Sequence, residues 1–369
     1  MITPAFSKKT FNKIKRIFPI KPNDKIYLPI IINPTNLENF LKIFPNSITV
    51  SFPNYTIYSN ILKNQFLAEK ILNNKITVTM DFFGIYSNFS SENATMTIIL
   101  FPTNLALNLI KYALHKIFTL SSTLALLIIV GSKKQNEIIS KLLANSQLKY
   151  SKSKSQSYNF YVIPKFNSTL NIQSKFTEYI FKIQYKKDFS EFEFYSSDGV
   201  FSKDKVDVGT NFLIETVLKE TKISKDDEII DYFSGLGVIG IVIAKKFEPK
   251  KIHFIESDII SLYLLKRNLN NYQIDQSIVH EMDGLEKPNI PFQTIDFIVA
   301  NPPTHIRKEE FINFLKISKD LLKIKGKLII VINKIIPYEQ SLKEFFPNPQ
   351  KIEVYQKNNY KIIINKKIN

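Results

Sequence analysis

Cysteine is absent from the 369-residue sequence, and histidine occurs only four times. Without thiol groups the chain can form no disulfide bond, and it can use neither a cysteine nucleophile nor a cysteine-bound metal. The four histidines show none of the paired spacing that is typical of zinc ligands. We therefore expect no metal site.

Long apolar runs are also missing. The longest, residues 120–130, is interrupted by polar residues at 121–123 and is much shorter than the ~20 residues of a membrane-spanning helix. Residues 1–16 carry basic side chains but no apolar core of the kind that signal peptides have. These features predict a cytoplasmic protein with no membrane partner.

Positive charge is in excess. The chain has 50 Lys and Arg against 33 Asp and Glu, which gives a net charge of +17 and a pI of about 9.5. This balance favours a polyanionic partner, RNA or DNA, through long-range attraction and the release of counterions. An AT-rich genome also enriches Lys, together with Asn, Ile and Phe, so part of the excess has this second explanation.

The length suffices for about two domains, and strand-like and helix-like segments alternate along the first half. This alternation predicts an α/β sheet. The strand-like segments are residues 25–31, 47–50, 95–100 and 123–130, and the helix-like segments are residues 36–44, 58–72 and 105–118.

The second half repeats part of this order. Residues 295–299 form an apolar run that is followed by a proline turn, a helical pattern over 309–322 and a strand pattern over 327–332. We interpret the halves as two copies of one α/β unit, although such units often look alike. The first copy has no Asn-Pro-Pro triplet and no glycine-rich loop, which indicates that it kept the fold and lost a cofactor site. We place the boundary near residue 172, in a polar linker over 167–187.

A glycine-rich turn lies between the strand pattern at 228–232 and the helix pattern at 239–247. Gly235, Gly237 and Gly240 form G-x-G-x-x-G, in which the missing side chains let a ligand approach the backbone. The motif alone is a weak signal, but a strand before it and a helix after it are the context that it requires. It is compatible with NAD as well as with other nucleotide cofactors.

Two acidic residues follow the next strands. Glu256 ends the strand pattern at 251–255 and suits ribose hydroxyls. Asp283 comes after the strand pattern at 277–280 and can accept a hydrogen bond from an adenine amino group. Upstream, Thr210 is a plausible N-cap for a helix over 211–219, or simply the start of a capped helix without further function.

The triplet Asn301-Pro302-Pro303 ends the strand at 295–299. The prolines stop the strand and remove two backbone donors. A rigidly held Asn beside an unbonded carbonyl presents acceptors outward and suits a planar amino group as substrate. By itself the triplet could also be a plain proline-rich turn.

The conjunction of glycine loop, Glu256, Asp283 and Asn301-Pro302-Pro303 resembles the motifs of class I, S-adenosylmethionine-dependent methyltransferases that modify amino nitrogens. The whole chain is similar to the bacterial ribosomal RNA guanine-N2 methyltransferases of the small-subunit methyltransferase C and large-subunit methyltransferase G type. The stretches that carry this closer resemblance are Gly-Val-Phe-Ser at 199–202, Asp-Val-Gly-Thr at 207–210, Asn-Pro-Pro-Thr-His at 301–305 and the tail at 354–363.

This resemblance implies an α/β fold of two tandem Rossmann-like class I methyltransferase domains, with a degenerate first domain (residues 1–172, RNA docking and support) and a catalytic second domain (173–369). It also implies S-adenosylmethionine as cofactor and transfer of its methyl group to the N2 amine of a guanine in rRNA, 16S rather than 23S. The implied catalytic residues are Asn301, Pro302, Pro303 and His305, and the implied cofactor-binding residues are Thr210, Asp231, Gly235, Gly237, Glu256, Asp283 and Asn301. The expected partner is rRNA or a ribosomal subunit, bound by a monomer.

Two residues depart from the pattern of the resembled family. Thr304 stands where the family has an aromatic residue after Pro-Pro, and Phe233 stands where it usually has the first glycine of the loop. Stacking a base on an aromatic ring contributes ~1–3 kcal/mol, so base binding should be weaker unless another ring substitutes. Two rival functions remain open, methylation of a protein glutamine amide and an RNA-binding paralogue without catalysis.

Overall fold

A computed structural model shows two compact units. The first comprises Met1–Ile180 with Ser197–Gly199, and the second comprises Phe181–Ser196 with Val200–Asn369. The structure describes residues 7–30, 33–44, 46–83, 85, 94–118, 124–146, 148–166, 175–187, 190–304, 306–333, 339–346, 353–357 and 359–368. The predicted boundary near residue 172 lies outside the described residues.

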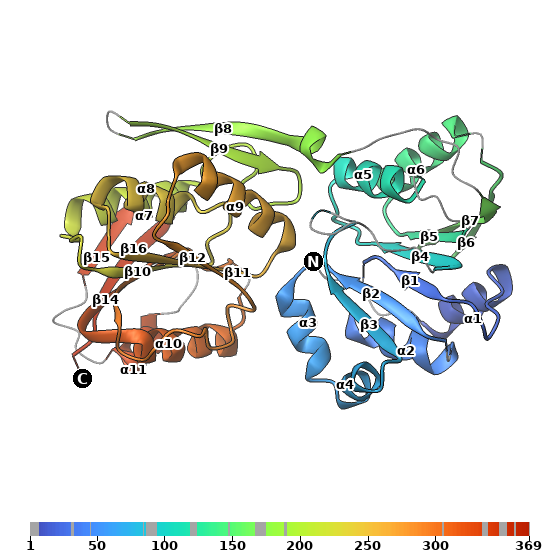
Figure 1. Cartoon of the computed structure of the whole chain (residues 1–369), viewed down its shortest axis with the longest axis horizontal. Coiled ribbons are helices and arrows are strands. Elements are labelled where there is room, and N and C mark those ends of the chain that lie inside the picture. The colour runs from blue at the N-terminus through green and yellow to red at the C-terminus, as the bar shows by residue number, and fades with distance from the viewer. Residues whose placement is uncertain are drawn as a thin grey trace. The chain divides into compact units, whose positions relative to one another are not determined.

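The first unit is built on a seven-stranded sheet with the order β3-β2-β1-β4-β5-β7-β6. Helices α1–α4 cover one face of this sheet, and α5 and α6 cover the other (Figure 1). Its strands are β1 (Ile26–Leu28), β2 (Ile48–Phe52), β3 (Ile76–Met80), β4 (Met96–Phe101), β5 (Leu124–Val130), β6 (Ser151–Ser155) and β7 (Tyr158–Phe166). Its helices are α1 (Lys8–Ile17), α2 (Pro34–Ile43), α3 (Tyr55–Leu62), α4 (Gln65–Leu72), α5 (Leu107–Phe118) and α6 (Lys133–Asn145), followed by a short 3-10 helix, η1 (Phe176–Tyr179).

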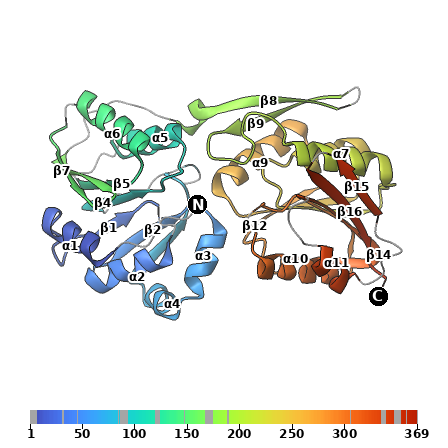
Figure 2. The same cartoon turned by 180° about the vertical axis from the view of Figure 1, so that it is seen from behind.

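The second unit repeats this plan in a sheet with the order β12-β11-β10-β13-β14-β16-β15. Helices α7–α9 lie on one face, and α10 and α11 on the other, as Figure 2 shows from behind. Its strands are β10 (Glu228–Tyr232), β11 (Lys251–Glu256), β12 (Ser277–Glu281), β13 (Ile295–Ala300), β14 (Leu322–Asn333), β15 (Glu353–Lys357) and β16 (Tyr360–Lys366). Its helices are α7 (Val208–Glu220), α8 (Val238–Phe247), α9 (Ile259–Tyr272), α10 (Lys308–Leu321) and α11 (Glu339–Phe345).

The identical strand order confirms the prediction of two tandem Rossmann-like domains. In both sheets the first five strands along the chain pair in parallel, and the last two pair antiparallel. Parallel strands that are covered on both faces read as continuous apolar runs, which is why residues 295–300 and 124–130 were recognisable as strands. Among the described residues, no helix has the length and apolarity to cross a bilayer.

Three local predictions were wrong. The helix expected over 58–72 is split into α3 and α4, because the Asn64 side chain accepts the backbone N–H of Leu67 (3.1 Å) and caps a new helix. Asp207, not Thr210, is the N-cap of α7, and it accepts from the N–H groups of Gly209 (2.8 Å) and Thr210 (3.3 Å). The segment read as a polar linker contains strand β8 (Ile180–Lys187).

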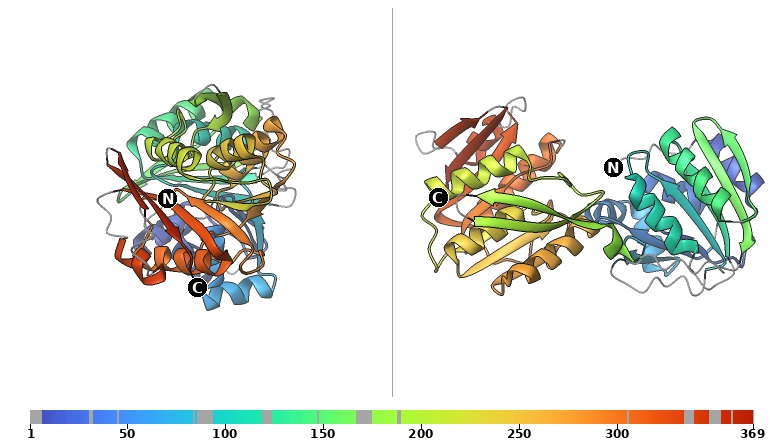
Figure 3. Two further views of the ribbon diagram at one scale, coloured as in Figure 1. Left: turned by 90° about the vertical axis from the view of Figure 1, so that its left-hand side faces the viewer. Right: turned by 90° about the horizontal axis from the view of Figure 1, so that it is seen from above.

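Strand β8 pairs with β9 (Ser190–Ser197) in a separate two-stranded sheet that lies along α9 in the second unit (Figure 3). Hydrogen bonds tie the sheet to that helix. The Asn268 amide oxygen accepts from the N–H of Tyr195 (2.7 Å), and the Tyr272 hydroxyl accepts from the N–H of Glu193 (2.6 Å). The small sheet is therefore part of the second unit's packed structure rather than a loose linker.

We predict that Gly240→Ala destabilises the second unit. A Cβ at this position would lie 2.3 Å from a ring atom of the buried Phe254, and both residues belong to regular elements that cannot easily separate. Overpacking of this kind costs ~1–3 kcal/mol, and a domain of this size loses roughly 2–4 °C of Tm per kcal/mol. Thermal unfolding should show the loss, whereas Lys246→Ala, on the exposed side of the same helix, should leave the Tm unchanged. An unchanged Tm in Gly240→Ala would contradict the close packing of α8 on the sheet.

Candidate active site

A pocket opens in the second unit at the carboxyl ends of β10 and β13. These two strands are neighbours in the sheet. After β10 the chain goes on to β11, which pairs on one side of β10, whereas after β13 it goes on to β14, which pairs on the opposite side of β13. This switch in direction is where open α/β sheets bind ligands. Its lining includes residues of the turn before α7, the glycine loop and Asn301 directly after β13.

The glycine loop forms the floor of the pocket. Gly235 (φ +55°) and Gly237 (φ +80°) have backbone conformations that residues with side chains seldom adopt. A Cβ built on Gly235 would meet no atom within 4 Å, so the space above this residue is open to a ligand. The Ser234 hydroxyl donates to the carbonyl of Asp231 (2.8 Å) and holds the loop against the strand end. The loop is thus rigid and accessible, as cofactor binding requires.

Glu256 ends β11 and supports the loop. One carboxylate oxygen accepts from the N–H of Gly235 (2.7 Å), and the other accepts from the N–H groups of Ser257 and Asp258 (2.8 Å each). A carboxylate has about four acceptor positions, so one remains for a ligand hydroxyl. Burial, followed by the nearby Asp258 charge, raises the pKa of Glu256 to about 6.

Asp231 and Asp283 lie deeper than the pocket lining. Asp231 is fully buried, and its carboxylate accepts from the N–H of Gly240 (2.8 Å). Burial raises the pKa of Asp231 well above its ordinary value. Asp283 is also buried, and one of its oxygens accepts from the N–H of Leu285 (3.1 Å) in the loop after β12. Asp231 therefore holds α8 against the sheet, while Asp283 shapes the loop at the end of the adjacent strand.

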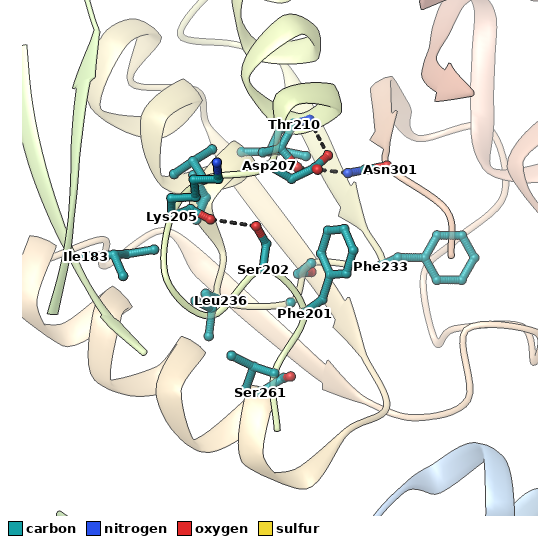
Figure 4. A pocket seen from close by; sticks show the side chains of 16 residues that line it. Ile183, Phe201, Ser202, Lys205, Asp207, Thr210, Phe233, Leu236, Ser261 and Asn301 are labelled. Carbon is teal, nitrogen blue, oxygen red and sulfur yellow. Dashed lines mark hydrogen bonds between the residues drawn. The ribbon is translucent and has the colours of Figure 1, made fainter. Parts of the chain in front are cut away.

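Asn301 and Thr210 meet across the pocket. The Nδ2 of Asn301, just after β13, donates to the Oγ1 of Thr210 in the first turn of α7 (2.8 Å; Figure 4). Because this bond engages the amide nitrogen, the amide oxygen is the atom left to accept a hydrogen bond from a substrate. Asp207 sets the position of Thr210 by capping the same helix turn. The structure thus joins two predicted site residues that lie 91 positions apart.

The rest of the proline motif follows Asn301 along the chain, beyond the pocket lining. Pro302 is buried, whereas Pro303 and Thr304 are exposed. His305 lies outside the described residues. Of the predicted site residues, Thr210, Gly235 and Asn301 line the pocket, while Gly237 is the N-cap of α8 behind it.

Sequence reasoning gave no role to two further residues of the pocket. One is Phe201, which lines the pocket and is 67% exposed. Its stretch, Gly-Val-Phe-Ser, carries part of the family resemblance, but that resemblance assigned Phe201 no role. The other is Asp207, the N-cap of α7. An Asp directly before a helical pattern is an N-cap signal, so the sequence could have predicted this role. Phe233 lines the pocket at a φ of +61°, in the conformation that favours the glycine usually present there.

Comparisons with known proteins agree with this geometry. The model of the methyltransferase small domain family matches residues 191–364. The uncharacterized protein YbxB of Bacillus subtilis is 31% identical over 144 residues, which cover 39% of this chain and 70% of that protein. The ribosomal RNA small subunit methyltransferase C of Buchnera aphidicola is 30% identical over 154 residues, covering 40% of this chain and 45% of that protein.

Among solved structures, a T. thermophilus 16S rRNA N2 methyltransferase in complex with AdoMet and guanosine is similar over 98% of this chain and 92% of its own. The TM-score is 0.76 at 15% sequence identity, so the likeness concerns the fold. In sequence, the chain spans about half the length of the small-subunit methyltransferase C proteins that it matches.

The state of Glu256 predicts how cofactor binding depends on pH. A ribose hydroxyl donates best to the charged carboxylate, which predominates above the pKa of about 6 and is lost below it. Affinity for S-adenosylmethionine should therefore be constant at higher pH and fall by up to ~tenfold per pH unit below about 6. Calorimetric titration at pH values above and below the pKa of Glu256 measures this affinity. Glu256→Gln should bind more weakly and show no such break, and a wild-type affinity that is flat across the range would contradict the assignment.

Proposed function

The chain belongs to the methyltransferase small domain family of class I, S-adenosylmethionine-dependent methyltransferases, and from this premise we propose that it methylates the N2 amine of a guanine in small-subunit ribosomal RNA. The observation that carries the proposal is the oriented amide of Asn301 beside the glycine-loop pocket. The names of the similar proteins support the choice of rRNA.

The chemistry requires positioning rather than a strong base. When bound, S-adenosylmethionine supplies an activated methyl group. The guanine amine is a poor nucleophile because its lone pair is delocalised into the ring. The amide oxygen of Asn301 and the carbonyl of Pro302 accept its two hydrogens and so direct the lone pair toward the methyl group. A paired base cannot enter the pocket, so the guanine is flipped out or unpaired.

We assign the cofactor to the second unit alone. The backbone of Gly235 faces open space, Glu256 keeps an acceptor position for the ribose, and Asp283 ends the neighbouring strand on the adenine side. In the first unit, the strand that corresponds to β11 ends instead in the fully buried Phe52, followed by Pro53. One cofactor per chain is therefore expected.

The proposed function is tested by mass spectrometry of rRNA nucleosides from a strain that lacks the gene. One N2-methylguanosine of 16S rRNA should disappear and return with a plasmid-borne wild-type copy. Intact N2-methylguanosine in the deletion strain, together with loss of methylation on a protein glutamine, would replace the proposal by its nearest rival. If methylation of both rRNA and protein is unchanged in the deletion strain, the result favours an RNA-binding protein without catalytic activity.

The first unit supplies RNA docking in this proposal. Helix α1 has the sequence KKTFNKIKRI, without an acidic residue, and its apolar face is buried, while Lys9, Lys15 and Arg16 are exposed. Cations arranged in this way bind phosphates regardless of base sequence.

We predict that changing Lys9, Lys15 and Arg16 together to Glu weakens binding of a 16S rRNA transcript and flattens its dependence on salt. Each lost phosphate contact removes about 0.7–0.9 from the slope of log K against log salt. Filter binding across salt concentrations measures the slope. Replacing Lys222, Lys245 and Lys246 with Glu is the matched control, because it reverses the same number of charges on exposed lysines of the second unit. An unchanged slope in the α1 variant would exclude this helix from docking.

The role of Asn301 predicts a separation of rate from cofactor affinity. Asn301→Ala removes an acceptor that acts on the amine, so turnover should fall by ~10²–10³, by analogy with the loss of an oxyanion-hole donor. The Kd for S-adenosylmethionine should stay nearly constant, whereas Asp283→Ala should raise it. A wild-type rate in Asn301→Ala would show that the triplet is only a turn. Asn301→Asp, which keeps an acceptor, controls for local misfolding if the alanine variant binds cofactor poorly.

A further inference from the structure

We propose that Phe201 is the base-stacking residue of this site and takes the part that Thr304 cannot play. The inference rests on the proposed function, since it names the side chain that holds the target guanine. Thr304 is exposed and directly follows the two prolines. A threonine has no π-face, so nothing at this position can stack on a base.

Phe201 places a ring in the right pocket. It is 67% exposed and lines the same pocket as Asn301. In Figure 4 its ring points toward the Asn301 side chain. A single exposed apolar residue is common on protein surfaces and needs no explanation by itself. Phe201 differs from such residues because it lines the same pocket as Asn301, whose amide oxygen is the proposed acceptor for the guanine amine.

The turn that carries Phe201 is held in shape. The Ser196 hydroxyl donates to the carbonyl of Lys203 (2.7 Å), and the Ser202 hydroxyl donates to the carbonyl of Lys205 (2.6 Å). Ser202, the next residue along the chain, has a φ of +52°, which is uncommon for a residue with a side chain. Backbone strain of this kind costs free energy and is concentrated at functional sites. The ring is therefore presented by a fixed turn while its surface stays open.

The other ring of the pocket is already in use. Phe233 packs against Tyr232 (4.9 Å between ring centroids) and against Phe314 of α10 (5.3 Å), both of which are buried in the core. Within the described part of the chain, no aromatic ring packs on Phe201. Of the two phenylalanines, Phe201 is thus the one with a face available to a base.

Stacking would contribute mainly to substrate binding. A base lies on the ring both before and during transfer, so its loss should raise KM more than it lowers kcat. Phe201→Leu keeps an apolar side chain and removes the π-face. We expect it to raise the KM for a 16S rRNA transcript by about 5- to 150-fold, which corresponds to ~1–3 kcal/mol at 1.4 kcal/mol per tenfold. The Tm should stay at its wild-type value because the residue is exposed, whereas a loss of affinity for S-adenosylmethionine without a change in KM for RNA would assign the ring to the cofactor and overturn the proposal.

A second-site change makes this result specific to stacking. Adding Thr304→Phe to Phe201→Leu restores an aromatic side chain directly after the proline pair that follows Asn301 and should return the KM most of the way to its wild-type value. A wild-type KM in Phe201→Leu would overturn the proposal, and so would a raised KM that Thr304→Phe does not improve. A wild-type chain that transfers no methyl group to RNA would instead remove the proposed function itself.

The absence of tryptophan from the chain allows a direct readout. Phe201→Trp creates a single fluorophore in the pocket and should remain active. Guanosine, added in the presence of S-adenosylhomocysteine, should quench its fluorescence by stacking on the indole. Phe292→Trp is the matched control. Phe292 is 54% exposed and comes shortly before the first residue of β13, whereas Asn301 follows the last residue of that strand. Equal quenching of both variants, or full quenching of Phe201→Trp by S-adenosylhomocysteine alone, would show that the ring at 201 does not hold the base.

Discussion

The hydrogen bond between Asn301 and Thr210 is the contact on which the proposed chemistry depends. It joins the end of a central strand to the first turn of a helix, and it engages the amide nitrogen of Asn301, which leaves the amide oxygen as the acceptor. An unrestrained Asn side chain could present either its oxygen or its NH₂ group. Only the oxygen can accept a hydrogen from an amine, and in the structure the bond to Thr210 engages the NH₂ group and leaves that oxygen for the substrate.

The surrounding fold holds both partners of this bond in place. Asn301 follows β13, which lies in the middle of the sheet between β10 and β14. Thr210 belongs to a helix whose start is set by the Asp207 cap. The first unit shows what happens without these polar residues. There Pro102 follows β4 at the corresponding point, and the same strand order is kept. The fold depends on apolar strands, whereas the site depends on a few polar residues that can be lost separately.

The sequence was sufficient for most of the fold and for three of the residues that line the pocket, Thr210, Gly235 and Asn301. Apolar runs located the parallel strands, and the glycine loop and Asn301 were found because both follow such runs directly. Relations between distant residues were not predictable. Thr210 was recognised as a helix-start residue, but its contact with Asn301 arises only when β13 and α7 pack in three dimensions. The split at Asn64 was missed because a local cap overrides continuous helical periodicity.

A double-mutant cycle on the transfer rate tests the central claim most directly. Thr210→Val removes the acceptor of the hydrogen bond at nearly constant volume, and Asn301→Ala removes its donor together with the oxygen that Thr210 orients. If Thr210 acts only through Asn301, Thr210→Val lowers the rate in the wild-type background and has no further effect in Asn301→Ala. Equal rate losses in the two backgrounds would show that Thr210 acts independently, and would contradict an acceptor oriented by this hydrogen bond.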